Sequence, residues 1–192
     1  AEVARAIHGE KTVPLSERPV MTDADWAIFA PRITEFALRL KARGLWLAYH
    51  HHMGSVIETQ AEIDRLMAVT GHEVGLLLDT GHLTFAGGDP AVAARQHAAR
   101  IVHVHCKDIR RAVLQDVSAR DLPFLAAVLE GVFTVPGDGC VDYAAVLKPL
   151  AEAGYKGWLV VEAEQDPAKA HPLTYARMGH DNLALLARDA FG

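Results

Sequence analysis

Four short apolar runs of this chain each end in side chains that can ligate a metal or carry a proton, and this repeated pattern constrains the fold most. Apolar runs of this length, bounded by turn signals, are typical of buried β-strands. Proteins that alternate strands and helices place their chemistry at the carboxyl ends of such strands. The runs are residues 45–49, ending in His50, His51 and His52; 74–78, ending in Asp79 and His82; 101–104, ending in His105 and Lys107; and 158–161, ending in Glu162 and Glu164.

Helical patterns separate the apolar runs. Capping residues, first-turn prolines and terminal glycines predict helices over about 22–43, 59–71, 90–100, 122–129, 141–153 and 173–189, with a polar connection at 109–120 and a loop across the barrel mouth at 132–139. This alternation predicts an α/β fold with a parallel sheet. Four strands and a stub at residues 1–3 are present, whereas a (β/α)8 barrel needs eight, and open sheet edges are a liability. We therefore expect one domain, residues 1–192, that forms the C-terminal half to two-thirds of a TIM barrel whose N-terminal strands are missing.

Composition excludes several classes of protein. The chain has 192 residues, of which 51% are hydrophobic, so it can bury a core. A net charge of −5 argues against a partner bound through phosphate neutralisation, and no apolar run approaches the roughly 20 residues that span a bilayer. The two cysteines, Cys106 and Cys140, lie too far apart in sequence to suggest a disulfide framework. We expect a cytoplasmic protein with neither a nucleic-acid nor a membrane partner.

Asp79 and His82 follow a fully apolar run, where an unpaired buried carboxylate is costly. A helix cap or a turn is the alternative interpretation of Asp79. Because no helix is predicted directly after it, we favour a metal ligand at Asp79, with His82 facing the substrate.

Strand alternation places His103, His105 and Lys107 on one face and Cys106 in packing on the other. A lone histidine is more often a hydrogen-bonded core residue. With two polar neighbours on its face, His105 is better explained as a ligand or catalytic group.

Glu162 and Glu164 also share a face, and two carboxylates in one cavity repel each other unless a cation or a proton lies between them. Glu164 can instead be a surface residue, so Glu162 is the better ligand. Alternation sends at least one of the histidines at 50–52 inward. Glu58 either reaches the same mouth or stabilises the next helix through its dipole.

Carboxylates with one histidine suit Mn²⁺, Co²⁺ or Mg²⁺ better than a thiolate-type zinc site. Such an ion polarises a carbonyl and stabilises the enediolate left when the α-proton is removed. The residues alone therefore predict an isomerase, epimerase or dehydratase that acts on a sugar-like ketone.

From about Pro14 to Asn182, the sequence resembles the xylose-isomerase-like TIM-barrel superfamily, and within it the inosose dehydratase family. The resemblance rests on the strings LAYHHHMG, LLLDTGH with FAGGDP, HVHCKD, FTVPGDG and GWLVVEAEQDPAKA. It implies dehydration of scyllo-inosose (2-keto-myo-inositol) to a trihydroxycyclohexane-1,2-dione in inositol catabolism. It also implies Mn²⁺ or Co²⁺, with Mg²⁺ as an alternative, a role for reduced glutathione, and further N-terminal barrel strands.

Carried over residue by residue, the resemblance implies Asp79, His105 and Glu162 as metal ligands, plus a first glutamate. No glutamate stands at residues 48–50, so Glu58 is the predicted first ligand, with Glu2 or a residue of a missing strand as alternatives. The remaining roles are catalytic for Lys107, His82 and His51, among which the base stays open, and substrate-binding for His52, His103 and Glu164.

Two other functions stay open. A metal-dependent sugar or polyol isomerase or epimerase would use the same ligands but retain the β-hydroxyl. A non-catalytic half-barrel would need a partner chain and show a solution mass at least twice 20.8 kDa. The acidic balance argues against the superfamily's DNA-repair endonuclease activity. As partners we expect a small cyclic polyol ketone and further copies of the chain in a homo-oligomer.

Overall fold

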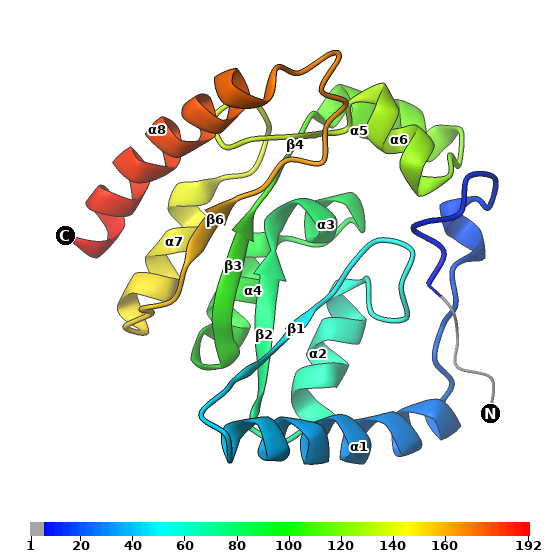
Figure 1. The fold of residues 1–192 in the computed structure, drawn as a ribbon, viewed down its shortest axis with the longest axis vertical. Helices are drawn as coiled ribbons and strands as arrows, with labels where there is room; N and C mark the ends of the chain where they lie inside the picture. The colour runs from blue at the N-terminus through cyan, green and yellow to red at the C-terminus, as the bar shows by residue number, and fades with distance from the viewer. Residues whose placement is uncertain (1–5) are drawn as a thin grey trace.

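Four parallel strands form the central sheet. In the computed structural model, which describes residues 6–192, they are β1 (Leu47–His50), β2 (Val74–Asp79), β3 (Ile101–Cys106) and β6 (Leu159–Val161). They lie in the order β1-β2-β3-β6, and every neighbouring pair is parallel (Figure 1). The predicted strands and the α/β class are confirmed. The expected strand stub at residues 1–3 lies outside the described residues.

Capping residues set the starts of the main helices. Thr22 and Thr59 each accept a hydrogen bond from the third residue of their helix, whose acidic side chain bonds back to the threonine N–H. Asp89 caps a third helix, which has Pro90 in its first turn. These helices and the later ones lie where the sequence predicts them: α1 (Asp23–Lys41), α2 (Gln60–Val69), α4 (Pro90–His97) with the 3-10 turn η2 (Ala98–Arg100), α7 (Tyr143–Glu152) and α8 (Pro172–Phe191).

The main core lies between these helices and one face of the sheet. Leu76, Leu78, Val104 and Cys106 alternate along β2 and β3 toward that face and are fully buried. Each buried leucine of this kind contributes about 2 kcal/mol of burial free energy. Cys106 is confirmed as buried packing. The opposite face of the sheet carries the polar residues at the carboxyl ends of the strands, and it corresponds to the inner wall of a barrel.

A smaller second core lies beyond the carboxyl end of β3. The sequence predicts a polar connection at 109–120, and this is wrong: Val113 and Val117 give that segment an apolar side that packs in the second core. The predicted loop at 132–139 contains a short strand, whose Phe133 is fully buried. The elements here are β4 (Asp108–Ile109), paired antiparallel with β5 (Phe133–Thr134), and the helices α5 (Arg111–Ala119) and α6 (Phe124–Glu130).

The two remaining short elements are the 3-10 turn η1 (Leu15–Glu17) and the helix α3 (Thr80–Phe85). Helix α3 follows β2 without a break and is not predicted from the sequence. Among the helices of residues 6–192, none is both long and apolar enough to cross a membrane.

Candidate metal centre

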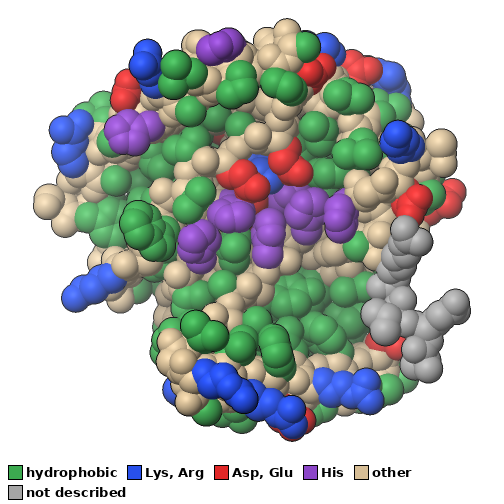
Figure 2. Space-filling view, viewed as in Figure 1, with side chains coloured by type: hydrophobic (Ala, Val, Ile, Leu, Met, Phe, Trp, Pro, Cys, Tyr) green, Lys and Arg blue, Asp and Glu red, His purple; other side chains and the backbone are tan. Residues whose placement is uncertain are grey.

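Each of the four parallel strands delivers one potential metal ligand to the same edge of the sheet. His50 and Asp79 are the last residues of β1 and β2, His105 lies next to the end of β3, and Glu162 directly follows β6. The strand register pairs Asp79 with His105 across β2 and β3. Figure 2 shows the result, a row of histidine side chains beside acidic ones at the centre of one face.

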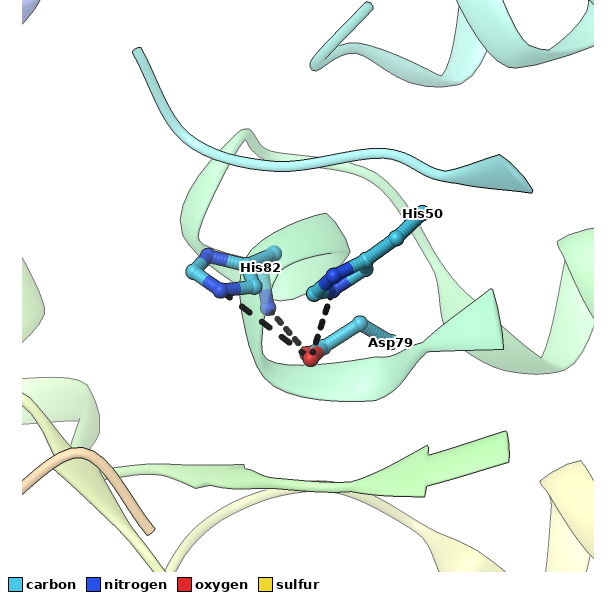
Figure 3. Close-up of side chains that lie close together, drawn as sticks. All are labelled: His50, Asp79 and His82. Carbon is cyan, nitrogen blue, oxygen red and sulfur yellow. Dashed lines mark hydrogen bonds and ion pairs between the residues drawn. The ribbon is translucent and has the colours of Figure 1, made fainter. Parts of the chain in front are cut away.

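The side chains converge on one oxygen of Asp79. His50 Nε2 lies 3.3 Å and His105 Nδ1 lies 3.4 Å from Asp79 Oδ2, and His82 Nε2 lies 4.0 Å from it. Figure 3 shows His50 and His82 directed at this carboxylate from either side. Two sets of three potential ligands therefore share Asp79, one with His50 and His82 and the other with His105 and Glu162.

The residues present fit a divalent metal ion. His105 Nδ1 and Glu162 Oε2 lie 2.7 Å apart and are buried, yet neither has a hydrogen-bond partner of good geometry among the described residues. Buried polar atoms without such a partner are costly, and a cation placed among them would satisfy both. Carboxylate and imidazole donors suit Mn²⁺, Co²⁺ or Zn²⁺.

Asp79 acts as a helix cap as well as a candidate ligand. Helix α3 begins directly after it, and its Oδ1 accepts a 2.9 Å hydrogen bond from the backbone N–H of His82. The sequence-based reason for setting the cap aside, that no helix follows at once, is therefore wrong. The two carboxylate oxygens therefore have different partners: Oδ1 caps α3, whereas Oδ2 is directed at the cluster. Burial opposes ionisation, but His82, His105, His50 and Lys107 outweigh it and hold the pKa of Asp79 well below its usual range.

Lys107 supplies the positive charge among the carboxylates. Its side chain is fully buried, and its Nζ lies 2.7 Å from Glu164 Oε2, 3.2 Å from Glu162 Oε2 and 3.5 Å from Asp79 Oδ2. Burial disfavours the ammonium, but the carboxylates of Asp79, Glu164 and Glu162 outweigh it and raise the pKa of Lys107. The repulsion expected between Glu162 and Glu164 is thus relieved by a cation on the chain itself.

His82 is a neutral imidazole next to this ammonium. Its Nε2 lies 3.0 Å from Lys107 Nζ and 3.3 Å from Glu164 Oε2. Burial, with a smaller contribution from Lys107, lowers the pKa of His82, although Asp79 and Glu164 oppose this. The balance is reversed at Glu164. Its contacts with His82 and Lys107 outweigh burial and lower the pKa of this carboxyl to about 2. The ring of Phe133 packs against Lys107, with its centroid 5.0 Å from Lys107 Nζ.

His105 carries a proton that a metal would displace. Burial opposes its charged form, but the carboxylates of Asp79 and Glu162 outweigh it and raise the pKa of His105 to about 9. A metal ion needs the neutral imidazole, so its binding at His105 releases a proton and strengthens as pH rises.

His51 holds the backbone of Asp79. It is fully buried, and its Nε2 accepts a 3.1 Å hydrogen bond from the backbone N–H of Asp79. Burial lowers the pKa of His51 to about 3, although Asp79 opposes this, so the ring stays neutral at physiological pH. The structure thus gives His51 a supporting position behind the cluster.

The neutral state of His51 predicts that the fold is weakened in mild acid. An unfolded histidine takes up its proton near pH 6.5, whereas folded His51 does so only near pH 3. Its contribution is therefore complete above pH 6.5 and is lost as pH falls toward 3, which amounts to about 2 kcal/mol between pH 7 and pH 5. Urea unfolding in the presence of EDTA at these two pH values measures the loss.

The variant His51→Gln isolates this contribution, because glutamine can accept the hydrogen bond from Asp79 but does not titrate. Its stability should change less between pH 7 and pH 5 than that of the wild type, while His52, whose pKa burial also lowers to about 3, titrates in both proteins. An equal pH dependence of the two proteins would contradict the assignment.

Comparison with known proteins assigns the chain to a family. The model of the xylose isomerase-like TIM barrel family matches residues 1–184. The chain belongs to the xylose isomerase-like TIM barrel family. Its fold and its four-stranded parallel sheet are those of part of such a barrel.

Curated relatives support membership. The chain is 54% identical over 190 residues to the rhizopine catabolism protein MocC of Rhizobium meliloti, which covers 99% of the chain and 58% of the relative. It is 43% identical to the inosose dehydratase of Histophilus somni, over 97% of the chain and 64% of the relative, and 46% identical to that of Clostridium tetani, over 92% and 60%. The chain thus spans about 60% of the length of these relatives.

Solved structures agree in fold. The crystal structure of the IolI protein with a bound zinc atom superposes with a TM-score of 0.68 at 18% identity, covering 92% of this chain and 61% of that one. The probable 3-DHS dehydratase AsbF of Bacillus anthracis gives 0.66 at 16% identity, covering 88% and 59%.

Among the family ligands predicted from the sequence, the structure leaves Glu58 apart. Its Oε2 accepts a 2.6 Å hydrogen bond from the backbone N–H of Gly54, and its Oε1 lies 3.3 Å from Arg18 Nε. Glu58 belongs to none of the ligand groups formed by the described residues, and the alternative, Glu2, lies outside them. His50, at the end of β1, occupies the strand end at which the family resemblance implies the first ligand.

The predicted substrate contacts occupy different depths. His52 packs against His82, with ring centroids 3.7 Å apart and the rings tilted by 41°, and forms a ligand group with His82 and Glu164. His103 lies two residues before His105 in β3 and is partly exposed, with its ring 5.3 Å from that of His105. His50 and Phe133 are the two site residues without a predicted role. The strand-end position of His50 was the available signal, whereas nothing local to Phe133 shows that its loop turns back under Lys107.

Proposed function

We propose that the chain belongs to a metal-dependent dehydratase that converts scyllo-inosose to a trihydroxycyclohexane-1,2-dione in inositol catabolism. The observation that supports this most is the convergence of four strand-end donors and a buried ammonium in a sequence 43–46% identical to inosose dehydratases. A polyol ketone offers the carbonyl and adjacent hydroxyl oxygens that such a cluster binds.

In this proposal His50, Asp79, His105 and Glu162 hold the metal, and Glu58 is left out because its carboxylate is engaged elsewhere. Mn²⁺ or Co²⁺ is the proposed ion, with Mg²⁺ as an alternative, and reduced glutathione is a further proposed cofactor. When bound, the ion polarises the substrate carbonyl as a Lewis acid.

The remaining residues move the protons. Lys107, protonated and fully buried, donates hydrogen bonds to the oxygen on which negative charge develops. His82, neutral and 3.0 Å from Lys107 Nζ, accepts the α-proton. As the β carbon–oxygen bond breaks, the same proton passes from His82 to the leaving hydroxide, which departs as water. Glu164 orients both groups through its contacts with Lys107 and His82.

The domain organisation, location, partners and assembly of the chain are proposed as well. Residues 1–192 form a single domain in the cytoplasm, acting on a small molecule without nucleic acid or membrane. Strands β1 and β6 end the described sheet on either side, where a complete barrel would pair them with further strands. A homo-oligomeric assembly is proposed in addition.

The relative in rhizopine catabolism supports a second candidate, because its identity of 54% exceeds that of the named inosose dehydratases. A compound of rhizopine catabolism is then the substrate. An isomerase or epimerase reaction is distinguished from both by the absence of a diketone product.

The test is a dehydration assay on the Mn²⁺-loaded chain. We expect scyllo-inosose to give the ultraviolet absorbance of a diketone, with EDTA abolishing the signal and His82→Gln reducing kcat by about 100-fold. The exposed variant His180→Gln serves as the matched control. If the protein with its complete barrel also binds Mn²⁺ stoichiometrically but yields no diketone, the dehydratase is ruled out.

A further inference from the structure

The segment from Ile7 to Arg18, here called the N-terminal strap, lies against the loop that follows β1. The backbone N–H of Ile7 donates a 2.8 Å hydrogen bond to the Gly54 carbonyl. Gly54 has a φ of +72°, and a Cβ built there would lie 3.0 Å from the His8 nitrogen. Only glycine therefore combines this backbone conformation with so close an approach of the strap.

Glu58 and Arg18 anchor the far end of the strap. Arg18 contacts Glu58 and Glu62 through its guanidinium, at 3.3 and 2.8 Å, and donates to the Ser55 carbonyl at 3.2 Å. Glu58 in turn accepts the hydrogen bond from Gly54. The carboxylate that the sequence suggests as a metal ligand thus ties the strap to the loop that follows His50 and carries His51 and His52.

A third attachment crosses to the connection between α5 and α6. The backbone N–H and the hydroxyl of Ser16 donate to Asp121, at 3.1 and 2.5 Å. Asp121 has a φ of +45°, which residues other than glycine seldom adopt. The strap is therefore attached both to the loop after β1 and to the connection between α5 and α6, and Figure 1 shows the blue segment between the β1 loop and α6.

These attachments bring His8 to the candidate site. The His8 ring lies 4.9 Å from the His52 ring, which packs against the ring of His82. His8 is exposed, and its ring nitrogens have no hydrogen-bond partner among residues 6–192. A series of rings, His8, His52 and His82, thus runs from the strap to Lys107.

We propose that the N-terminal strap forms one wall of the substrate site and that His8 is a specificity residue, which hydrogen-bonds a substrate hydroxyl away from the reacting carbons. This inference rests on the proposed function. A polyol ring carries hydroxyls beyond the pair that reacts, and a site selects such a ring by pairing those hydroxyls. His8 offers both a donor and an acceptor on the side of the site away from β6.

The first experiment separates binding from chemistry. We expect His8→Ala to raise KM for scyllo-inosose about 10-fold with kcat within about 2-fold, because the lost hydrogen bond acts equally on substrate and transition state. His8→Gln should recover part of the loss. The control is His72→Ala, an exposed histidine at the opposite end of the sheet, before β2. Unchanged KM in His8→Ala, with an active wild type, would overturn the inference alone, whereas a wild type with its complete barrel that binds Mn²⁺ but is inactive would overturn the proposed function.

A second experiment tests the anchor without relying on activity. Glu58→Gln should speed hydrogen exchange of the Ile7 amide and its neighbours in the strap at least about 10-fold, while the amides of β2 keep their protection. Mn²⁺ affinity should stay as in the wild type. Unchanged exchange in the strap would show that Glu58 does not anchor it, and a loss of Mn²⁺ binding would return Glu58 to the ligand set.

Discussion

Replacing Asp79 by asparagine is expected to weaken Mn²⁺ binding by more than about 100-fold while the chain stays folded. Asp79 Oδ2 lies within 3.5 Å of His50, His105 and Lys107, so its negative charge is the common partner of the cluster. Asparagine retains an oxygen that can cap α3 but loses the charge. Electron paramagnetic resonance of free Mn²⁺ measures the affinity, and circular dichroism checks the fold.

Variants of neighbouring residues make this result specific. Asp79→Ala removes the cap as well and should cost a further 1 kcal/mol or so of stability, which separates the two functions of the side chain. His50→Gln should weaken Mn²⁺ binding at least about 10-fold, and Glu58→Gln should leave it unchanged. If Glu58→Gln loses the metal and His50→Gln retains it, the ligand set proposed from the structure is wrong and the sequence-based one is right.

Local signals explain why most of the fold is predictable. Thr22, Thr59 and Asp89 cap helices as their sequence contexts indicate, and the apolar runs at 74–78 and 101–104 become buried strands. The errors fall where long-range packing decides. Helix α5 packs Val113 and Val117 into the second core, to which the separate strand β5 contributes Phe133, and α3 begins at once because Asp79 caps it.

The candidate site shows the same division. Strand alternation correctly places His105 and Lys107 together, and the predicted neighbours Glu162 and Glu164 do meet them. Glu58 could not be separated from a ligand by sequence, since its partner Arg18 lies 40 positions earlier in an irregular segment. The contact of His8 with His52 is equally invisible, because no periodicity connects a loop to a strand end.

Replacing Lys107 by methionine is expected to destabilise the metal-free chain by about 3–5 kcal/mol. The substitution preserves the apolar stem but leaves Asp79, Glu162 and Glu164 without their ammonium in a site where Lys107 itself has no solvent exposure. For a chain of this length, such a loss lowers the Tm by about 10 °C. Differential scanning calorimetry in EDTA measures it, and Lys169→Met, which alters an exposed lysine, is the matched control.

Two further measurements separate lost charge from lost packing. Saturating Mn²⁺ should raise the Tm of Lys107→Met more than that of the wild type, because a divalent ion restores positive charge to the same carboxylates. Adding Glu164→Gln to Lys107→Met should recover part of the stability, since removing both members of a buried pair costs less than removing one. A double variant as unstable as the sum of the two single variants would instead mean that Lys107 and Glu164 have no stabilising interaction energy, and the electrostatic role assigned to their contact would then fail.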